Sequence, residues 1–326
     1  MLRDMVPGKA VLLAAGRGTR LGSLTADRPK PLLEVAGKPL IAHIVGGMIE
    51  SGVREFVVVS GHLAQQIEQW CTTFATQNPG VTIQTIRQQH LNGTAGAMLA
   101  ARSLLAGEDR FMFGWGDILM DGANYPRFAA ASHRVDCDLL LAVNDIDDPW
   151  RGAAVYVDPE MRVTRLIEKP PPGTSSTRWN CAGLFSASPS LFDYLDRLAP
   201  SSRGELELPQ AIAAMIAAGR MVRAFEVQGF WSDVGTADDL AAVCAHTSIR
   251  ERLLDRSGVG QFGAGSCGFH GARAQSGRGA RCATVCGARP GPSQSDRRAY
   301  RLQRSSGAAR RDRPIHHHRR RSHSVR

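Results

Sequence analysis

The stretch LAAGRGTRLGSLTADRPKPLLEVAGKPL occupies residues 13–40 and decides how the rest of the chain is interpreted. An apolar run over residues 9–15 leads into it and is typical of a buried parallel strand. The glycine-rich turn that follows lets backbone N–H groups approach a phosphate chain closely. Two cations accompany the turn: Arg20 directly after it, and Lys30 between two prolines. Lys30 could by itself be a solvated surface lysine, but two prolines that hold its backbone rigid argue against that.

Two common phosphate-binding motifs do not fit this turn. The dinucleotide-binding fingerprint requires a third glycine at the position of Leu21, and the P-loop requires a Gly-Lys-Ser/Thr tripeptide that does not follow. A glycine-rich turn alone is more often only a tight turn. Its function therefore has to be argued from the segments around it.

Strand-like and helix-like segments alternate along the first part of the chain. Strands are expected over residues 9–15, 55–60, 81–87 and 110–115, and helices over residues 39–51, 63–74 and 96–105. This alternation with short joints predicts a parallel sheet covered by helices on both faces. Short strands over residues 138–143, 153–157, 163–167 and 181–186 extend it as a mixed sheet, and helices over residues 206–218 and 237–246 flank a strand over residues 222–227. The predicted fold class is α/β, with a Rossmann-like doubly wound mixed sheet.

The last seventy residues differ in composition from the rest of the chain. Residues 257–326 contain fifteen arginines, no lysine and two aspartates, which gives this segment a net charge of +13. Since the whole chain has a net charge of +10, residues 1–256 carry about −3. This segment has almost no Ile, Leu or Val and cannot bury enough apolar surface to offset chain entropy. We expect a disordered basic tail, or a shifted reading frame of a GC-rich gene, which resequencing would decide.

Several classes of protein are excluded by composition. No apolar run approaches the roughly 18 to 20 residues that span a bilayer, and no signal-peptide pattern follows the N-terminus. The seven cysteines are scattered and are expected to be free thiols. We therefore expect a cytoplasmic protein that does not bind membranes.

The turn and the lysine motif resemble the sugar-1-phosphate nucleotidylyltransferase family, which includes glucose-1-phosphate thymidylyl- and uridylyltransferases and mannose-1-phosphate guanylyltransferases. The family pattern is Gly-x-Gly-Thr-Arg-Leu followed by Pro-Lys-Pro-Leu, and both stand here without a break. Matching elements run in family order from residue 9 to about residue 246. The resemblance implies a nucleotidyltransferase domain over residues 1–250, with the nucleotide-diphospho-sugar transferase fold. It also implies the reaction of an NTP with a sugar-1-phosphate to give an NDP-sugar and pyrophosphate.

The resemblance places the nucleotide on two loops. It implies that Arg20 and Lys30 hold the triphosphate and stabilise charge at the α-phosphorus, because this chemistry depends on positioning and cations. Gln88 would read the base edge with its amide, although Gln89 is a competing candidate. The residues expected to contact the nucleotide are Ala15, Gly16, Gly18, Thr19, Gln88, Gly93 and Thr94.

Four later segments complete the predicted site. Asp117 in Gly-Trp-Gly-Asp and Asp233 in Trp-Ser-Asp-Val-Gly-Thr are implied to be the ligands of Mg²⁺, since two carboxylates with phosphate oxygens and water make a hard oxygen site. Glu168 and Lys169 in Glu-Lys-Pro are implied to bind the sugar hydroxyls and the sugar phosphate, and Asn180 belongs to a turn beside the sugar. Without the family context, an ordinary turn would explain the Gly-Asp pair equally well, and a solvated ion pair would be the favoured interpretation of the Glu-Lys pair.

Other functions and partners were weighed against this prediction. The alternative on the same fold is a catalytically silent, nucleotide-binding regulatory subunit, although all four charged residues of the predicted reaction centre are present. A nucleic acid is not expected as a partner, because the Arg-rich tail has no interleaved aromatic residues. Many relatives continue into a left-handed β-helix, for which residues 258–326 lack the regularly spaced aliphatics. The base, the sugar and assembly into a homo-oligomer stay open.

Overall fold

The computed structural model describes residues 7–246, so the expectations for the basic tail lie outside the described residues. The nine strands of the main sheet are β1 (Lys9–Leu13), β4 (Glu55–Ser60), β5 (Thr82–Arg87), β6 (Phe111–Trp115), β8 (Leu139–Asp145), β9 (Ala153–Val157), β10 (Val163–Glu168), β11 (Trp179–Ala187) and β12 (Val222–Glu226). The helices are α1 (Leu40–Glu50), α2 (Ala64–Gln77), α3 (Thr94–Ala100), α4 (Asn124–Arg134), α5 (Leu191–Leu195), α6 (Leu208–Ala217) and α7 (Ala237–Ala245). Short strand pairs are formed by β2 (Glu34–Val35) with β3 (Lys38–Pro39) and by β7 (Ile118–Met120) with β13 (Trp231–Asp233).

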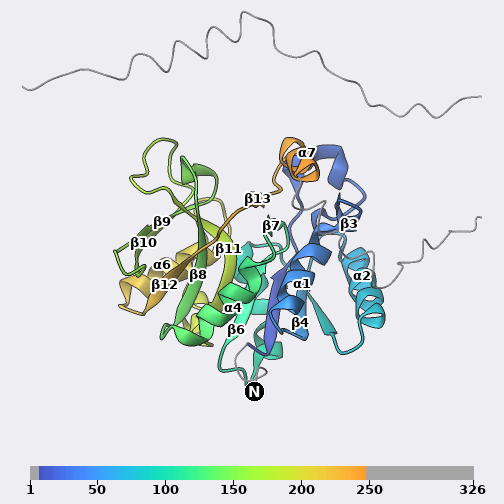
Figure 1. Ribbon diagram of the computed structural model, residues 1–326, viewed down its shortest axis with the longest axis horizontal. Coiled ribbons are helices and arrows are strands. Elements are labelled where there is room, and N and C mark those ends of the chain that lie inside the picture. The colour runs from blue at the N-terminus through green and yellow to red at the C-terminus, as the bar shows by residue number, and fades with distance from the viewer. Residues whose placement is uncertain (1–6, 247–326) are drawn as a thin grey trace, which may run out of the picture. The chain divides into compact units, whose positions relative to one another are not determined.

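The sheet is mixed, as the sequence predicts. Strands β6, β1, β4 and β5 are parallel neighbours in that order, and β11 continues the sheet antiparallel to β6. Strand β11 pairs with β8 along one edge, and β12 adds to β8 in parallel. Along its other edge β11 pairs with β6 at residues 184–187 and with β9 at Asn180. Figure 1 shows this fan of strands from β12 to β5.

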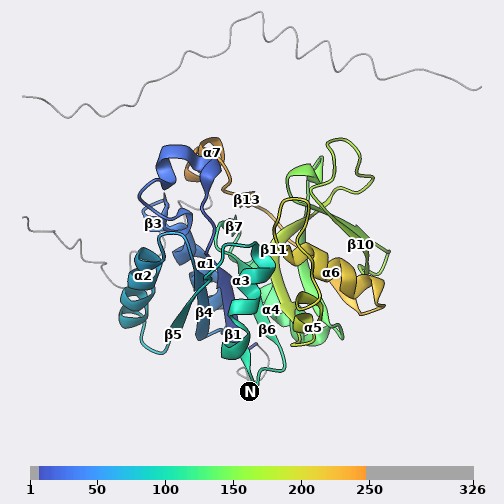
Figure 2. The same cartoon turned by 180° about the vertical axis from the view of Figure 1, so that it is seen from behind.

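Helices cover both faces of the sheet because successive side chains of a strand point to opposite faces. Ala10 and Leu12 of β1 belong to a buried cluster with α1, α2 and α4. Val11 and Leu13 belong to a second cluster with α3, α5 and α6. Figures 1 and 2 show α1 and α4 on one face and α3, α5 and α6 on the other. The expected doubly wound arrangement is therefore confirmed.

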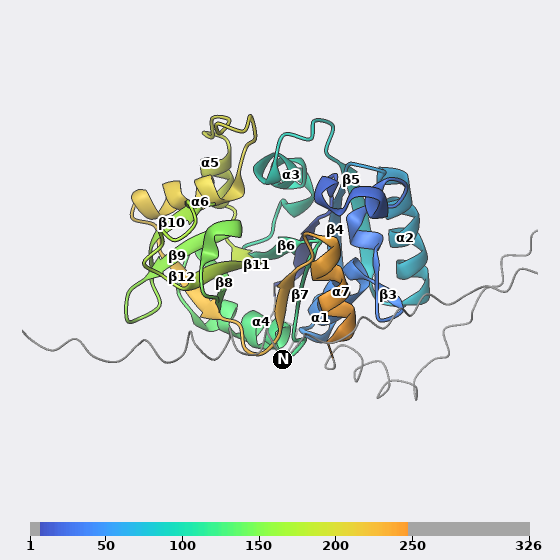
Figure 3. The ribbon, with the colours of Figure 1, turned by 90° about the horizontal axis from the view of Figure 1, so that it is seen from above.

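The order of the strands defines where a ligand crevice opens. The chain passes from β1 to β4 and β5, and then returns to place β6 on the other side of β1. At such a switch in strand order the loops after the strands diverge, and ligands bind beyond the carboxyl ends. Figure 3 shows β7 between the half of the sheet that contains β8, β9 and β10 and the half that contains β4 and β5, with α7 on the side of β4 and β5.

Several features of the fold differ from the sequence prediction, and the short helix α5 and the pair β2–β3 are among the elements that were not predicted. Helix α4 was not predicted, because a proline at position 126 and several polar residues obscure its periodicity. It contacts α1 closely at Gly47, where a Cβ would lie 2.3 Å from the ring of Tyr125. Helix α3 begins at Thr94 and ends at Ala100, and a 3-10 turn over Arg102–Leu105 replaces its expected second half. The pair β7–β13 was also missed. Within the described part of the chain, no helix has the length and apolar character needed to cross a bilayer.

Candidate functional site

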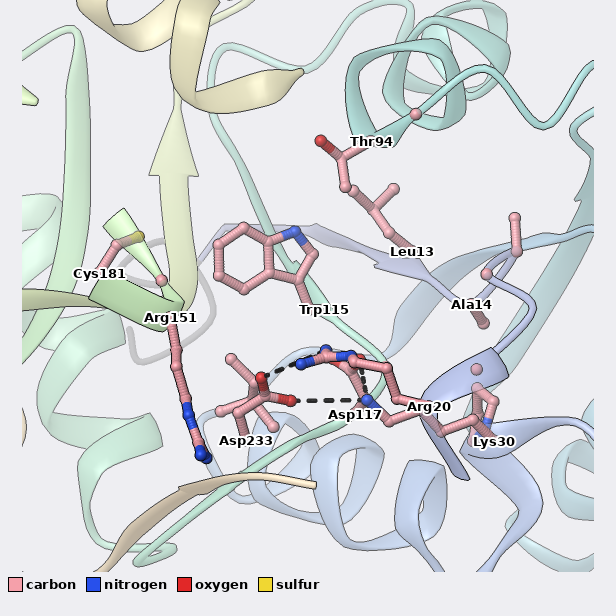
Figure 4. Close-up of a pocket in the computed structure, with 18 of the residues that line it drawn as sticks. Leu13, Ala14, Arg20, Lys30, Thr94, Trp115, Asp117, Arg151, Cys181 and Asp233 are labelled. Carbon is pink, nitrogen blue, oxygen red and sulfur yellow. Dashed lines mark hydrogen bonds and ion pairs between the residues drawn. The ribbon is translucent and has the colours of Figure 1, made fainter. Parts of the chain in front are cut away.

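One cavity of about 870 Å³ opens at the carboxyl ends of β1 and β6. Its wall contains every residue that the sequence prediction assigned to the site: Ala15, Gly16, Gly18, Thr19, Arg20, Lys30, Gln88, Gly93, Thr94, Asp117, Glu168, Lys169, Asn180 and Asp233. Figure 4 shows part of this wall, with Arg20 and Lys30 facing Asp117 and Asp233. The fold therefore brings residues from distant segments into one cleft.

The glycine-rich loop after β1 is folded against the lysine that follows it in sequence. Gly18 has φ +65°, in the left-handed region that favours glycine, and a Cβ there would lie 3.1 Å from the Cβ of Lys30. The hydroxyl of Thr25 donates to the carbonyl oxygen of Gly18 at 3.0 Å and holds the loop closed. Lys30 begins a 3-10 turn (Lys30–Leu32) and is only 6% exposed. The lysine is therefore a buried part of the loop, and the solvated alternative is wrong.

Strands β7 and β13 bring the two predicted metal ligands together. Asp233 is the register partner of Ile118, and the backbone N–H of Val234 donates to the carbonyl oxygen of Asp117 at 3.1 Å. The ammonium of Lys30 lies 2.5 Å from Oδ2 of Asp117 and 3.5 Å from Oδ1 of Asp233. Asp117 follows β6 directly, so this pairing joins both carboxylates to the end of a parallel strand.

The electrostatic environment of the carboxylate pair is asymmetric. Burial and the neighbouring Asp117 raise the pKa of Asp233, while Lys30 and Arg20 oppose the shift. The guanidinium of Arg20 is 4.0 Å from Oδ2 of Asp233. Both carboxylates already converge on one ammonium, so the hard oxygen donors suit a cation such as Mg²⁺. Within residues 7–246 no group of three or more His, Cys, Asp or Glu side chains is arranged for a metal, so substrate oxygens and water would have to complete its coordination.

The structure separates the two candidate glutamines. Gln88 is 8% exposed and lines the cavity, whereas Gln89 is exposed and lies outside the cavity wall. The amide nitrogen of Gln88 donates to Oδ1 of Asn92 at 2.9 Å and to the carbonyl oxygen of Gly93 at 3.0 Å. Asn92 and Gly93 thus fix the orientation of this side chain.

A second segment braces the Gly93 loop. Gly93 has φ +106°, and a Cβ there would lie 2.4 Å from the carbonyl oxygen of Leu206. That carbonyl accepts from the N–H of Ala95 at 2.9 Å, and the N–H of Leu208 donates to the hydroxyl of Thr94 at 3.0 Å. The segment over residues 204–208, which leads into α6, therefore supports the Gly93 loop.

The predicted sugar residues lie on the wall formed by β9, β10 and β11. Glu168 Oε1 is 3.6 Å from the ammonium of Lys169 and 3.4 Å from the guanidinium of Arg203. Burial raises the pKa of Glu168, while Lys169 and Arg203 oppose the shift. The backbone N–H of Lys169 donates to the carbonyl oxygen of Gly152 at 2.8 Å, which ties β10 to the loop before β9.

Three buried polar atoms in the cavity wall have no hydrogen-bond partner among the described residues. They are Oδ1 of Asn180, Nε1 of Trp115 and Oδ1 of Asp148. The amide nitrogen of Asn180 is satisfied by Oδ1 of Asn144 at 3.0 Å. Unpaired buried polar atoms are uncommon in native proteins and require an explanation. Because three such atoms line one cavity, its wall is suited to binding polar ligands.

Sequence reasoning missed several residues of this wall. Trp115 faces the cavity (Figure 4) and its ring fits against Gly183, where φ is +77° and a Cβ would lie 2.3 Å from the ring. Its place in Gly-Trp-Gly-Asp, two residues before Asp117, was a signal that could have identified it. Arg17 and Arg151 also line the cavity. Arg17 lies inside the recognised turn, but Arg151 lies in a loop without a recognised motif.

Comparison with known proteins agrees with this architecture. The model of the nucleotidyl transferase family matches residues 9–249. Since this match covers most of the chain, the chain belongs to the nucleotidyl transferase family.

Two individual proteins of known name are similar to this chain over most of its length. The bifunctional protein GlmU of Methanococcus maripaludis strain C5 is 30% identical over 237 residues, which cover 73% of this chain and 54% of GlmU. The UTP–glucose-1-phosphate uridylyltransferase AglF of Haloferax volcanii is 30% identical over 238 residues, covering 71% of this chain and 93% of AglF. The chain spans about half the length of the GlmU relatives that it matches.

Solved structures share the fold. A UDP-glucose pyrophosphorylase in complex with UDP-glucose superposes with a TM-score of 0.66 at 18% identity, covering 75% of this chain and 98% of that one. A putative glucose-1-phosphate thymidylyltransferase from Bacillus anthracis gives a TM-score of 0.65 at 23% identity and covers 73% and 94% of the two chains.

Proposed function

We propose that this protein transfers a nucleotidyl group from an NTP to a sugar-1-phosphate and releases pyrophosphate. The observation that carries the proposal is the cluster in which Lys30 contacts both Asp117 and Asp233 while Arg20 lies beside it, at the mouth of the glycine-rich loop. Family membership and the shared fold support the same reaction class. The silent regulatory alternative has no specific observation in its favour.

The chemistry requires charge stabilisation rather than a general base. An oxygen of the sugar phosphate attacks the α-phosphorus of the NTP, and the bond from that phosphorus to the oxygen bridging to the β-phosphate breaks. The nucleophile is already ionised at neutral pH, because a phosphate monoester loses its second proton at about pH 6. The protein therefore has to align two anions and stabilise the charge that passes to pyrophosphate.

We assign the triphosphate to the loop that contains Gly16, Gly18 and Thr19, with Arg20 and Lys30 as its cations. Asp117 and Asp233 would hold Mg²⁺, which when bound neutralises phosphate oxygens. Lys30 contacts both carboxylates through its ammonium, and the carbons of its side chain pack against Gly18 of the loop. This packing of the lysine between the loop and the carboxylate pair supports the assignment.

We assign the base and the sugar to opposite walls of the cavity. Gln88 holds its amide nitrogen against Asn92 and Gly93, so its carbonyl oxygen is the group we expect to face a donor on the base. The carboxylate of Glu168 would accept from sugar hydroxyls, and the ammonium of Lys169 would contact the sugar phosphate. Ala15 and Thr94 would contribute contacts to the nucleotide, and Asn180 a contact to the sugar. NTPs and sugar phosphates are cytoplasmic metabolites, so the proposal includes a cytoplasmic location.

The test is pyrophosphate release from a panel of NTPs and sugar-1-phosphates, with two arginine variants. Arg20→Gln removes a guanidinium from the cavity, and loss of one such charge-stabilising group is expected to lower kcat by about 100- to 1000-fold. Arg28→Gln is the matched control, because Arg28 lies on the same segment outside the cavity wall and pairs with Glu34 at 3.6 Å. No turnover with any substrate pair, or equal loss in both variants, would contradict the proposal.

A further inference from the structure

The charges of the cavity are unevenly paired. Lys30, Arg20 and Lys169 each lie within 4.0 Å of a carboxylate in the same wall. Arg17 and Arg151 line the same cavity and, within residues 7–246, form no hydrogen bond or ion pair with another residue. An always-protonated guanidinium facing a cavity without a partner is suited to an anion of the ligand.

The two unpaired arginines lie on different walls. Arg17 belongs to the glycine-rich loop, where the proposed function already supplies a triphosphate. Arg151 ends the 3-10 turn Pro149–Arg151, between β8 and β9. Figure 4 shows its side chain entering the cleft on the side of Asp233 away from Arg20 and Lys30. The triphosphate loop therefore does not account for Arg151.

The surroundings of Arg151 connect it to the sugar wall. The carbonyl oxygen of the next residue, Gly152, accepts from the N–H of Lys169 at 2.8 Å. A Cβ on Gly152 would lie 2.2 Å from Oδ1 of Asn180, so the turn sits directly against that amide. Three residues assigned to the sugar-1-phosphate, Glu168, Lys169 and Asn180, thus lie on the elements that the turn contacts.

The turn also holds the backbone of Arg151 in place. Pro149 is buried, and the N–H of Gly152 donates to its carbonyl oxygen at 3.2 Å. The guanidinium of Arg151 lies 5.2 Å from the ring centre of Trp150, which restricts the side chain without neutralising its charge. The charge is therefore held at the cavity and is still free to bind an anion.

We propose that Arg151 is a specificity-determining residue that binds an anionic group of the sugar substrate. A guanidinium donates two parallel hydrogen bonds to a phosphate or a carboxylate. The group is either the 1-phosphate itself or a second acidic substituent on the sugar, such as the carboxylate of a uronic acid. This inference rests on the proposed function and names the substrate class of the acceptor half of that site.

The experiment measures binding and turnover of two sugar phosphates that differ by one carboxylate. Dissociation constants of glucose-1-phosphate and glucuronic acid 1-phosphate are determined by titration calorimetry for the wild type, Arg151→Gln and Arg151→Lys. Pyrophosphate release then gives KM for each sugar phosphate and for the NTP. Arg178→Gln is the control, because Arg178 directly precedes β11 outside the cavity wall and is already paired with Asp145 at 2.7 Å and Asp147 at 3.0 Å.

Loss of the charged contact in Arg151→Gln is expected to weaken sugar-phosphate binding about 10- to 100-fold, with KM for the NTP unchanged. Arg151→Lys should recover part of the loss, since it keeps the charge but not the paired donors. Equal weakening for both sugars identifies the 1-phosphate as the anion, and weakening confined to the glucuronic acid derivative identifies the carboxylate.

Two outcomes would overturn the inference in distinguishable ways. If the wild type is active and Arg151→Gln binds both sugars as tightly as Arg178→Gln does, the assignment of Arg151 alone is wrong. If the wild type releases no pyrophosphate with any pair from the panel of NTPs and sugar-1-phosphates, both the inference and the proposed function are wrong.

Discussion

Replacing Lys30 by methionine tests the central cluster, because it removes one charge while keeping the length of the side chain. The lysine side chain is 8% exposed, and its ammonium lies 2.5 Å from Asp117 and 3.5 Å from Asp233. Without the ammonium, the two neighbouring carboxylates lose the cation that both contact and repel each other. The folded state of Lys30→Met should therefore be destabilised by their repulsion.

The magnitude follows from the burial of the three groups. At an effective dielectric constant of about 20, the contact with Asp117 is worth about 7 kcal/mol of attraction and the contact with Asp233 about 5 kcal/mol, before the cost of removing the charges from water. Removing one member of a buried pair typically costs about 3 to 5 kcal/mol. Asp117 and Asp233 keep 32% and 36% of their side-chain surface exposed, so water screens them and we expect the lower value, about 3 kcal/mol. For a domain of this size that lowers Tm by about 6 to 12 °C.

The assay is thermal unfolding with and without Mg²⁺. Excess Mg²⁺ should restore much of the lost Tm in Lys30→Met, because a divalent cation replaces the missing ammonium between the carboxylates. Adding Asp233→Asn should restore part of it without metal, because it removes the like charge.

Lys9→Met is the matched control for this prediction. Lys9 also joins two acidic side chains, at 3.2 Å from Glu108 and 3.8 Å from Glu55, but it lies outside the cavity wall. Its Tm should respond to Mg²⁺ no more than that of the wild type. An unchanged Tm in Lys30→Met, or an equal response of both variants to Mg²⁺, would refute the reasoning.

Two further predictions concern the sugar wall. Gly183→Ala should lower the stability by about 2 to 4 kcal/mol, because a Cβ would meet the ring of Trp115 at 2.3 Å in addition to the strain of a positive φ. Gly173→Ala, at a similar φ with nothing within 4 Å, should show the backbone strain alone, and an equal loss of Tm in both variants would contradict the role of the ring. Burial raises the pKa of Glu168 in the folded protein above its ordinary value of 4.5. Between these two pKa values the folded protein binds more protons than the unfolded chain, so its free energy of unfolding falls as the pH rises through this range. Above the raised pKa, the ionised and buried Glu168 therefore destabilises the folded state. Glu168→Gln should therefore raise Tm relative to the wild type at neutral pH and lose this advantage below pH 4.5. Glu160→Gln, at an exposed position, is the control and should show no such trend. The opposite pH trend for Glu168→Gln would show that the attraction of Lys169 and Arg203 outweighs burial.

The sequence predicted the fold where local patterns carry the information. Apolar and alternating runs of strand length located β1, β4, β5 and β6 to within a few residues, and helical periodicity located α1 and α2 in the same way. Helix α4 was missed because Pro126 and several polar residues obscure its periodicity. Its close contact with α1, where the Tyr125 ring packs on Gly47, joins two distant segments and leaves no signature in either one alone. The pair β7–β13 was missed because each strand has only three residues.

The sequence by itself determined which residue types are available for the chemistry. A glycine-rich turn with two cations, an acid after a buried strand and a Glu-Lys pair are local motifs, and all lie in one cavity wall. Only the tertiary structure decided how these groups meet. Lys30 and Asp233 are 203 positions apart and come into contact because β13 pairs with β7 beside the end of β6. The charge balance of the cavity, and the unpaired Arg151 within it, likewise depend on distances between side chains from different elements, which no single stretch of sequence encodes.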